Sequence, residues 1–167
     1  PAIAARAAAD RAALEALREQ GKSLEKISGS VDLEIGTVDA SKARAEIKKS
    51  GKEFGIALTK EMERSLDFSF VDKLVSEGFK KADISGIVAP IQAHADATKK
   101  SCQAVASDVA KTVSAIDSEL RKIEKGNYKP GAALDAMNAS VDALRANVAS
   151  MYREGASQMQ AYGAAIT

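Results

Sequence analysis

The stretch that decides the fold is Ile84–Ile123, which reads ISGIVAPIQAHADATKKSCQAVASDVAKTVSAIDSELRKI. Apolar and small residues recur along it at alternating three- and four-residue spacing: Ile84, Val88, Ile91, Ala95, Thr98, Cys102, Val105, Val109, Val113, Ile116, Leu120 and Ile123. This period places one narrow apolar stripe on a helix, where it can face a partner helix, as in coiled coils and long bundles. The stretch therefore predicts a long helix packed in a bundle.

The same spacing continues on both sides of this stretch. Toward the C-terminus it passes Leu134, Met137, Val141, Leu144, Val148, Met151, Gly155, Met159, Tyr162 and Ile166. Toward the N-terminus it passes Ile3, Ala7, Leu14, Leu17, Gly21, Leu24, Ile27, Val31, Ile35, Val38, Ile47, Phe54, Leu58, Met62 and Leu66. Because short connections between long helices make antiparallel neighbours, the pattern predicts an all-α, elongated, antiparallel three-to-four-helix bundle with two or three long helices. We expect a single domain over residues 1–167.

The predicted helices cover residues 2–66, 70–81, 84–125 and 132–163, of which the second is short. No proline interrupts the chain between Pro1 and Pro90, so we expect the first helix to be continuous, bent near Gly29, and about 95 Å long at 1.5 Å per residue. The alternative is that it folds back near Gly29. Ser69 and Asp83 are candidate N-caps of the next two helices, and Pro130 is placed to start the last one.

The composition favours thin, closely packed helices. Hydrophobic residues make up 46% of the chain but aromatic residues only 4%, and alanine, the best helix former, is abundant. Charged residues make up 28%, and the net charge of +1 provides no electrostatic footprint for nucleic acid. We therefore expect no nucleic-acid partner.

The chemistry-bearing residues are too few for a recognisable catalytic or metal site. One histidine and one cysteine exclude the zinc sites that need several such ligands from a single chain. The Glu-x-x-His pattern of di-metal bundles is absent because Ile91 stands three residues before His94. The sequence thus predicts a non-enzyme without catalytic residues, metal or cofactor. We expect His94 to be a half-exposed helix residue and Cys102 to be a buried small hydrophobe.

Two functional hypotheses remain. One is a structural or interaction protein, a rod with an aromatic plug of Phe68, Phe70 and Phe79 at its corner. Its possible exposed tip loop is formed by Gly126, Asn127, Tyr128, Lys129 and Pro130. The other is an amphipathic helical bundle that binds lipid or fatty acid by exposing its apolar faces. Lipid binding needs broad apolar faces, so the narrow stripe favours the rod, and a homodimer would show the same stripe.

The alanine-rich start AARAAADRAALE at 4–15, the long apolar stripes and the loop at 126–131 together resemble the helical core of trypanosome surface coat proteins. Among these, the chain is most similar to the variant surface glycoproteins and to the glutamic acid/alanine-rich coat protein. This resemblance implies a cell-surface, extracellular rod among neighbouring coat molecules, with an unknown host or vector ligand. It also implies a membrane attachment only through a GPI lipid anchor outside this chain. Insect apolipophorin-like and fungal surface lipid-binding bundles are the next most similar classes.

Overall fold

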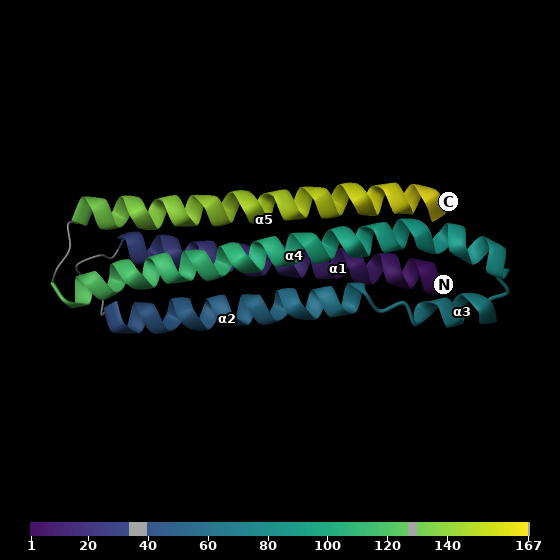
Figure 1. The fold of residues 1–167 in the computed structure, drawn as a ribbon, viewed down its shortest axis with the longest axis horizontal. Helices are drawn as coiled ribbons and strands as arrows, with labels where there is room; N and C mark the ends of the chain where they lie inside the picture. The colour runs from purple at the N-terminus through teal and green to yellow at the C-terminus, as the bar shows by residue number, and fades with distance from the viewer. Residues whose placement is uncertain (34–39, 127–129, 167) are drawn as a thin grey trace.

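A computed structural model describes residues 1–33, 40–126 and 130–166. It contains four long helices, α1 (Ala2–Leu33), α2 (Ala40–Ser65), α4 (Lys81–Glu124) and α5 (Pro130–Ile166), and one short helix, α3 (Phe70–Ser76). The long helices lie side by side in an elongated bundle (Figure 1). The predicted all-α bundle is therefore confirmed. Its length is set by α4, whose 44 residues span about 66 Å at 1.5 Å per residue.

The four long helices form a ring in chain order. Contacts join α1 to α2, α2 to α4, α4 to α5 and α5 back to α1. Every neighbouring pair is antiparallel (Figure 1). Helix α3 and both ends of the chain lie at one end of the bundle, and α4 passes into α5 at the other (Figure 1).

The prediction of one continuous helix over residues 2–66 is wrong. The chain forms α1 and α2, which are separate antiparallel neighbours, and Gly29 lies within α1. The connection at 34–39 is outside the described residues. The physical reason is coverage of the apolar stripe, because α4 and α5 are too short to cover a 95 Å helix. Two shorter helices, α1 packed against α5 and α2 packed against α4, bury their apolar faces around a common core.

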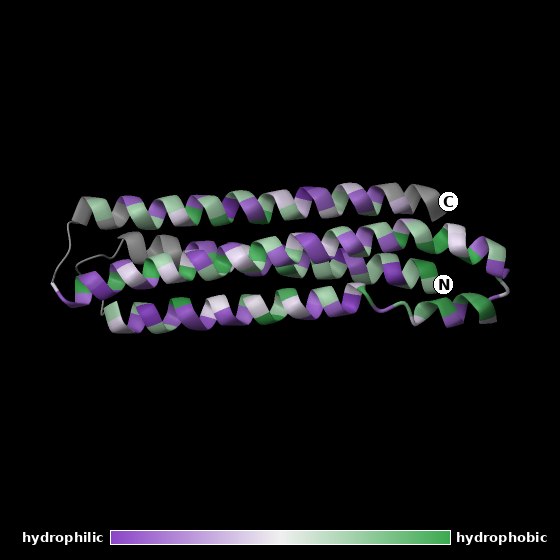
Figure 2. Ribbon diagram, viewed as in Figure 1, coloured by the Kyte–Doolittle hydropathy of each residue, from purple (hydrophilic) through white to green (hydrophobic). Residues whose placement is uncertain are grey.

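The core follows the predicted stripes closely in α4 and α5. Figure 2 shows hydrophobic and hydrophilic residues alternating along each long helix. The central core cluster contains Leu17, Leu24, Phe54, Leu58, Cys102, Val105, Val109, Leu144, Val148 and Met151. Among the described residues, the predicted stripe is wrong at Leu66, which is 41% exposed. In the first turns of α1 the fully buried positions are Ala2, Arg6 and Asp10, whereas the predicted Ile3 and Ala7 are half-buried and pack against the edges of core clusters.

The helix ends agree with the sequence in part. Helix α5 begins at Pro130 as predicted, since proline needs no N–H partner in the first turn. Ser69 takes the N-cap position of α3, but its side chain makes no capping hydrogen bond. The prediction of Asp83 as an N-cap is wrong because α4 begins two residues earlier, after Lys80. Pro90 lies inside α4.

Candidate functional site

Two ionic residues of α1, Arg6 and Asp10, occupy core positions near the α3 end of the bundle. Arg6 is 7% exposed and Asp10 only 1%. They lie one helical turn apart, on the face that also carries the buried Ala2 and Leu17. Charged side chains are almost never buried to this degree without a partner. Their partners come from α2, from the turn that follows it and from α5.

Arg6 binds the C-terminal end of α2. Its two terminal nitrogens donate to the backbone carbonyls of Ser65 at 2.5 Å and Asp67 at 2.6 Å. The rings of Phe68 and Phe70 lie 5.3 and 5.4 Å from its guanidinium carbon. The last carbonyls of a helix have no partner within the helix and carry partial negative charge. A cation at this point therefore satisfies them and fixes α2 against α1.

The predicted aromatic plug is confirmed for two of its three residues. Phe68 and Phe70 have ring centroids 5.7 Å apart. Both pack against a small core cluster formed by Ile91, Met159 and Tyr162. Phe79 is 37% exposed and takes no part in this cluster.

Asp10 is the acceptor at the centre of the charged network. It accepts hydrogen bonds from Arg64 at 2.6 Å, from the Tyr162 hydroxyl at 2.5 Å and from Nε of Arg6 at 3.4 Å. Arg64 also donates to both oxygens of Glu61, at 2.9 and 2.6 Å. Two carboxylates thus meet two guanidinium groups, and the formal charge of this group of side chains is zero.

Two members of the network, Arg64 and Tyr162, have raised pKa values. The pKa of Arg64 is raised, chiefly by the hydrogen bond with Glu61. Burial raises the pKa of Tyr162, and the hydrogen bond to Asp10 adds to this effect. Neither group can therefore exchange a proton near pH 7, which is what a general acid or base must do.

His94 is buried, and the prediction that it is half-exposed is wrong. The side chain is 5% exposed because its ring packs inside the bundle against Tyr162, with ring centroids 5.4 Å apart. Its side chain hydrogen bonds with Gln158 of α5, while Nδ1 has no partner among the described residues. Burial lowers the pKa of His94, so the imidazole is neutral at pH 7.

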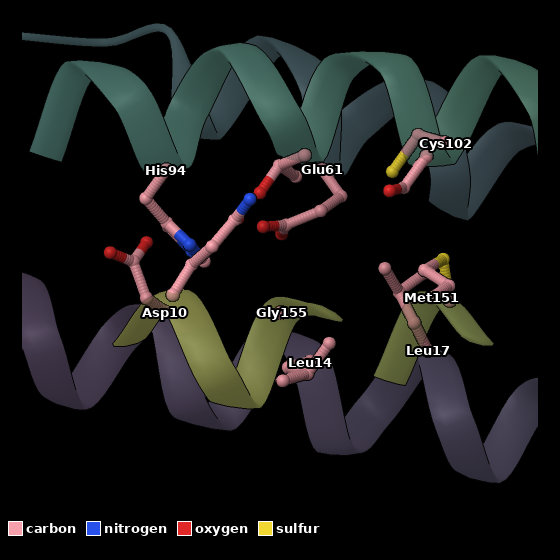
Figure 3. A pocket seen from close by; sticks show the side chains of 11 residues that line it. Asp10, Leu14, Leu17, Glu61, His94, Cys102, Met151 and Gly155 are labelled. Carbon is pink, nitrogen blue, oxygen red and sulfur yellow. The ribbon is translucent and has the colours of Figure 1, made fainter. Parts of the chain in front are cut away.

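A small cavity lies beside His94 at the centre of the bundle. Its volume is about 20 Å³. Each of the four long helices contributes at least one polar lining residue: Asp10 from α1, Glu61 from α2, His94, Thr98 and Ser101 from α4, and Gln158 from α5. Figure 3 shows side chains from these helices converging on it. A cavity of this size has room for one water molecule and for no larger ligand.

Cys102 lines the same cavity, and its thiol has low reactivity. It is 1% exposed, which confirms the predicted buried position. Burial raises the pKa of its thiol to about 12, and only the thiolate is an effective nucleophile or metal ligand. Within the described residues, no group of three or more His, Cys, Asp or Glu side chains is placed to hold a metal ion. The geometry here supports packing and hydrogen bonding.

A second charged network joins α2 to α4 at the other end of the bundle. Asp117 accepts from Arg44 at 2.7 Å and pairs with Arg121 at 3.4 Å and Lys48 at 3.5 Å. Arg44 also bonds Glu124 at 2.6 Å. The pKa of Asp117 is lowered, chiefly by the hydrogen bond from Arg44. This network is more open to solvent than the one around Asp10, so it contributes less per contact.

The predicted tip loop lies at the end of the bundle opposite α3. Gly126 follows the end of α4, is exposed, and has a φ of +68°, a left-handed conformation that glycine adopts without strain. Pro130 is the first residue of α5. Asn127, Tyr128 and Lys129 are outside the described residues.

The sequence reasoning missed most of the network around Asp10. It assigned no role to Arg6, Asp10, Glu61 or Arg64, and it placed Tyr162 in the stripe only as an apolar residue. The sequence did contain an indication that Arg6 and Asp10 lie on the buried face of α1. Arg6 and Asp10 share the face of Ala2 and Leu17, so a stripe drawn through them fits the helical period as well as one through Ile3 and Ala7.

The chain matches no known family, no curated protein and no solved structure. The interpretation of its function therefore depends on its own geometry.

Proposed function

We propose that the protein is a non-enzymatic structural rod of the surface-coat type, whose role is to space and shield through its shape. Polar contacts at all four interfaces between neighbouring helices carry this proposal. Arg64 bonds Asp10 between α2 and α1, and Arg44 bonds Asp117 between α2 and α4. The other two interfaces have the pairs Asn147–Asp108, between α5 and α4, and Tyr152–Glu15, between α5 and α1.

These contacts favour a bundle that stays closed. An exposed pair contributes only about 0–1 kcal/mol, but separating any two neighbouring helices breaks at least one pair and exposes part of the core. A lipid-binding bundle must separate its helices to present their apolar faces. The cavity beside His94, of about 20 Å³, is also far too small for a fatty acid. Both features support a rod that works in its closed form.

The two ends of the rod differ, which suits a molecule that stands on a surface. Both chain ends lie at the same end of the bundle as α3, and the passage from α4 to α5 is at the far end (Figure 1). Among the described residues, no helix is both long and apolar enough to cross a membrane. In the proposed function, an attachment at the α3 end would direct the tip around Gly126 and Pro130 outward, as the contact surface for neighbouring molecules or a ligand.

The proposal is tested by measuring how the protein stands on a membrane. The chain is tethered to a supported bilayer through a C-terminal tag, and neutron reflectometry gives the thickness of the layer. A standing rod gives about 66 Å, the length of α4. A layer of roughly 20–25 Å, the width of two helices, means that the molecule lies flat and contradicts the proposal. An N-terminal tether is the matched control, and it should give the same thickness because both chain ends are at one end.

A second candidate function, lipid binding, is favoured by one observation. Three large apolar residues near the α3 end are exposed: Leu66 by 41%, Val75 by 55% and Phe79 by 37%. Hydrogen exchange in the presence of anionic and zwitterionic vesicles separates the two functions. A rod keeps the core amides of α4 protected, whereas a lipid-binding bundle loses that protection when vesicles are added. A Val75→Ser, Phe79→Ser double variant should suppress the loss if lipid contact begins at α3.

A further inference from the structure

We propose that the cavity beside His94 is a buried hydration site that holds one ordered water molecule, bonded to Nδ1 of His94. The first argument is the unpartnered atom. His94 is 95% buried, with 5% of its surface exposed, and its Nδ1 has no hydrogen-bond partner among the described residues. An unsatisfied polar atom in a protein interior is costly, and ordered water is the usual partner where side chains supply none.

The second argument is the size and lining of the cavity. A volume of about 20 Å³ exceeds the roughly 10–15 Å³ that one water requires and excludes a second. A buried water needs two to four polar partners. Asp10, Glu61, His94 and Gln158 all line this cavity, so the partners are present on four separate helices.

The third argument is charge, which selects water over an ion. The carboxylates of Asp10 and Glu61 are already bonded to the guanidinium groups of Arg6 and Arg64. A cation would find no unmatched negative charge, and an anion would face two carboxylates. A neutral molecule that can both donate and accept fits either tautomer of His94. The side chain of Gln158 also bonds the imidazole, while Nδ1 has no partner among the described residues.

The water would join the helices at one level of the bundle. Nδ1 belongs to α4, and Asp10, Glu61 and Gln158 belong to α1, α2 and α5. A polar layer of this kind penalises sliding of one helix against the others, because a shift of one turn leaves buried groups unpaired. The hydration site is therefore a positioning element for the α3 end of the rod.

The site is tested by ¹⁷O magnetic relaxation dispersion, which counts water molecules that stay inside a protein for longer than nanoseconds. We expect His94→Phe, which keeps a ring but removes the polar nitrogen, to hold one long-lived water fewer than the parent chain. The matched control Ile91→Val, a buried change one turn away that does not line the cavity, should hold the same number as the parent chain. Absence of any long-lived water in the parent chain, or an equal number in His94→Phe, overturns the proposal.

A second measurement covers the case in which His94→Phe does not fold. A crystal structure of the parent chain at high resolution should show one water within about 3.2 Å of Nδ1. If Nδ1 instead bonds a side chain, or if the cavity has collapsed around it, the proposal is wrong.

Discussion

The guanidinium group of Arg6 in α1 donates a hydrogen bond to the backbone carbonyl of Ser65, the last residue of α2. The Arg6 side chain thereby supplies a hydrogen-bond donor to a carbonyl at the end of a helix 59 positions away in the sequence. Because the same guanidinium bonds Asp67 and pairs with Asp10, it is the residue on which the α3 end of the bundle depends most.

The Arg6→Met variant is expected to lose about 3 kcal/mol of unfolding free energy. Removing one partner of a buried ion pair leaves the other charge uncompensated, which costs about 3–5 kcal/mol, and methionine recovers part of the packing. Urea unfolding followed by circular dichroism measures the loss. The control Arg11→Met changes an exposed arginine of the same helix and should alter stability by less than about 0.5 kcal/mol. Equal effects of the two variants would show that the contacts of Arg6 are unimportant.

The two tyrosines that bond carboxylates should differ in the stability that each hydroxyl provides. In Tyr162→Phe, buried Asp10 loses one of its donors, and we expect a loss of about 1.5 kcal/mol, as for hydrogen bonds to charged groups. Tyr152 bonds Glu15 at an exposed site, so Tyr152→Phe should cost less than about 0.5 kcal/mol. Thermal unfolding of both variants makes the comparison. A larger loss in Tyr152→Phe would contradict the central position of Asp10.

Two glycines of α2, one turn apart, should respond oppositely to alanine. A Cβ at Gly51 would lie 2.5 Å from Cγ2 of Val113 in α4, whereas at Gly55 it would meet nothing within 4 Å. Valine has one strongly preferred rotamer in a helix, so α2 must move away and lose packing in Gly51→Ala. We expect a loss of about 1–2 kcal/mol there and a gain of up to about 1 kcal/mol in Gly55→Ala. Urea unfolding of both variants measures these changes in the free energy of unfolding. A stabilised Gly51→Ala would mean that α2 and α4 are not in close contact at this position.

His94 should make the fold less stable in mild acid. Its pKa is lowered from 6.5, chiefly because burial disfavours the charged ring. Asp10 and Glu61 partly oppose this effect, and Arg6 reinforces it. Below pH 6.5 the unfolded chain binds a proton that the folded chain does not bind until its own lower pKa is reached. The free energy of unfolding therefore falls as the pH drops through this window, by at most about 1.4 kcal/mol per pH unit.

The measurement is urea unfolding at intervals between pH 5 and pH 8. His94 is the only histidine, so the dependence just below pH 6.5 should flatten in His94→Phe. From about one pH unit above 6.5, where neither the folded nor the unfolded chain binds a proton at this residue, it should make no pH-dependent contribution. A parent chain whose stability is constant or rises toward pH 5.5 would contradict burial of the neutral ring.

Cys102 should be protected from alkylation until the bundle unfolds. Its thiol is 1% exposed and has a pKa raised to about 12, so both access and thiolate population are low at pH 8. We expect the reaction with iodoacetamide to be at least about a hundredfold slower than in urea-unfolded protein, since a pKa raised by two or more units lowers the thiolate fraction by that factor. Fast alkylation under native conditions would show that the core opens locally around α4.

The apolar stripe of residues 84–123 and the one that follows it were readable from the sequence. A helix repeats every 3.6 residues, so local spacing alone identifies the face that must be covered. This is enough to predict an all-α bundle, the long α4, the start of α5 at Pro130 and the burial of Cys102. Each of these properties depends on residues within a few turns of one another.

Only the tertiary structure decided the partners of each face. Periodicity cannot show that the chain turns back between α1 and α2, because that outcome depends on how much apolar surface the other helices can cover. It also cannot identify a buried charge, since Arg6 and Asp10 are tolerable in the core only through Ser65, Arg64 and Tyr162. The burial of His94 also depends on tertiary structure. Its ring packs against Tyr162 of α5, and the local spacing along α4 does not identify that neighbouring helix.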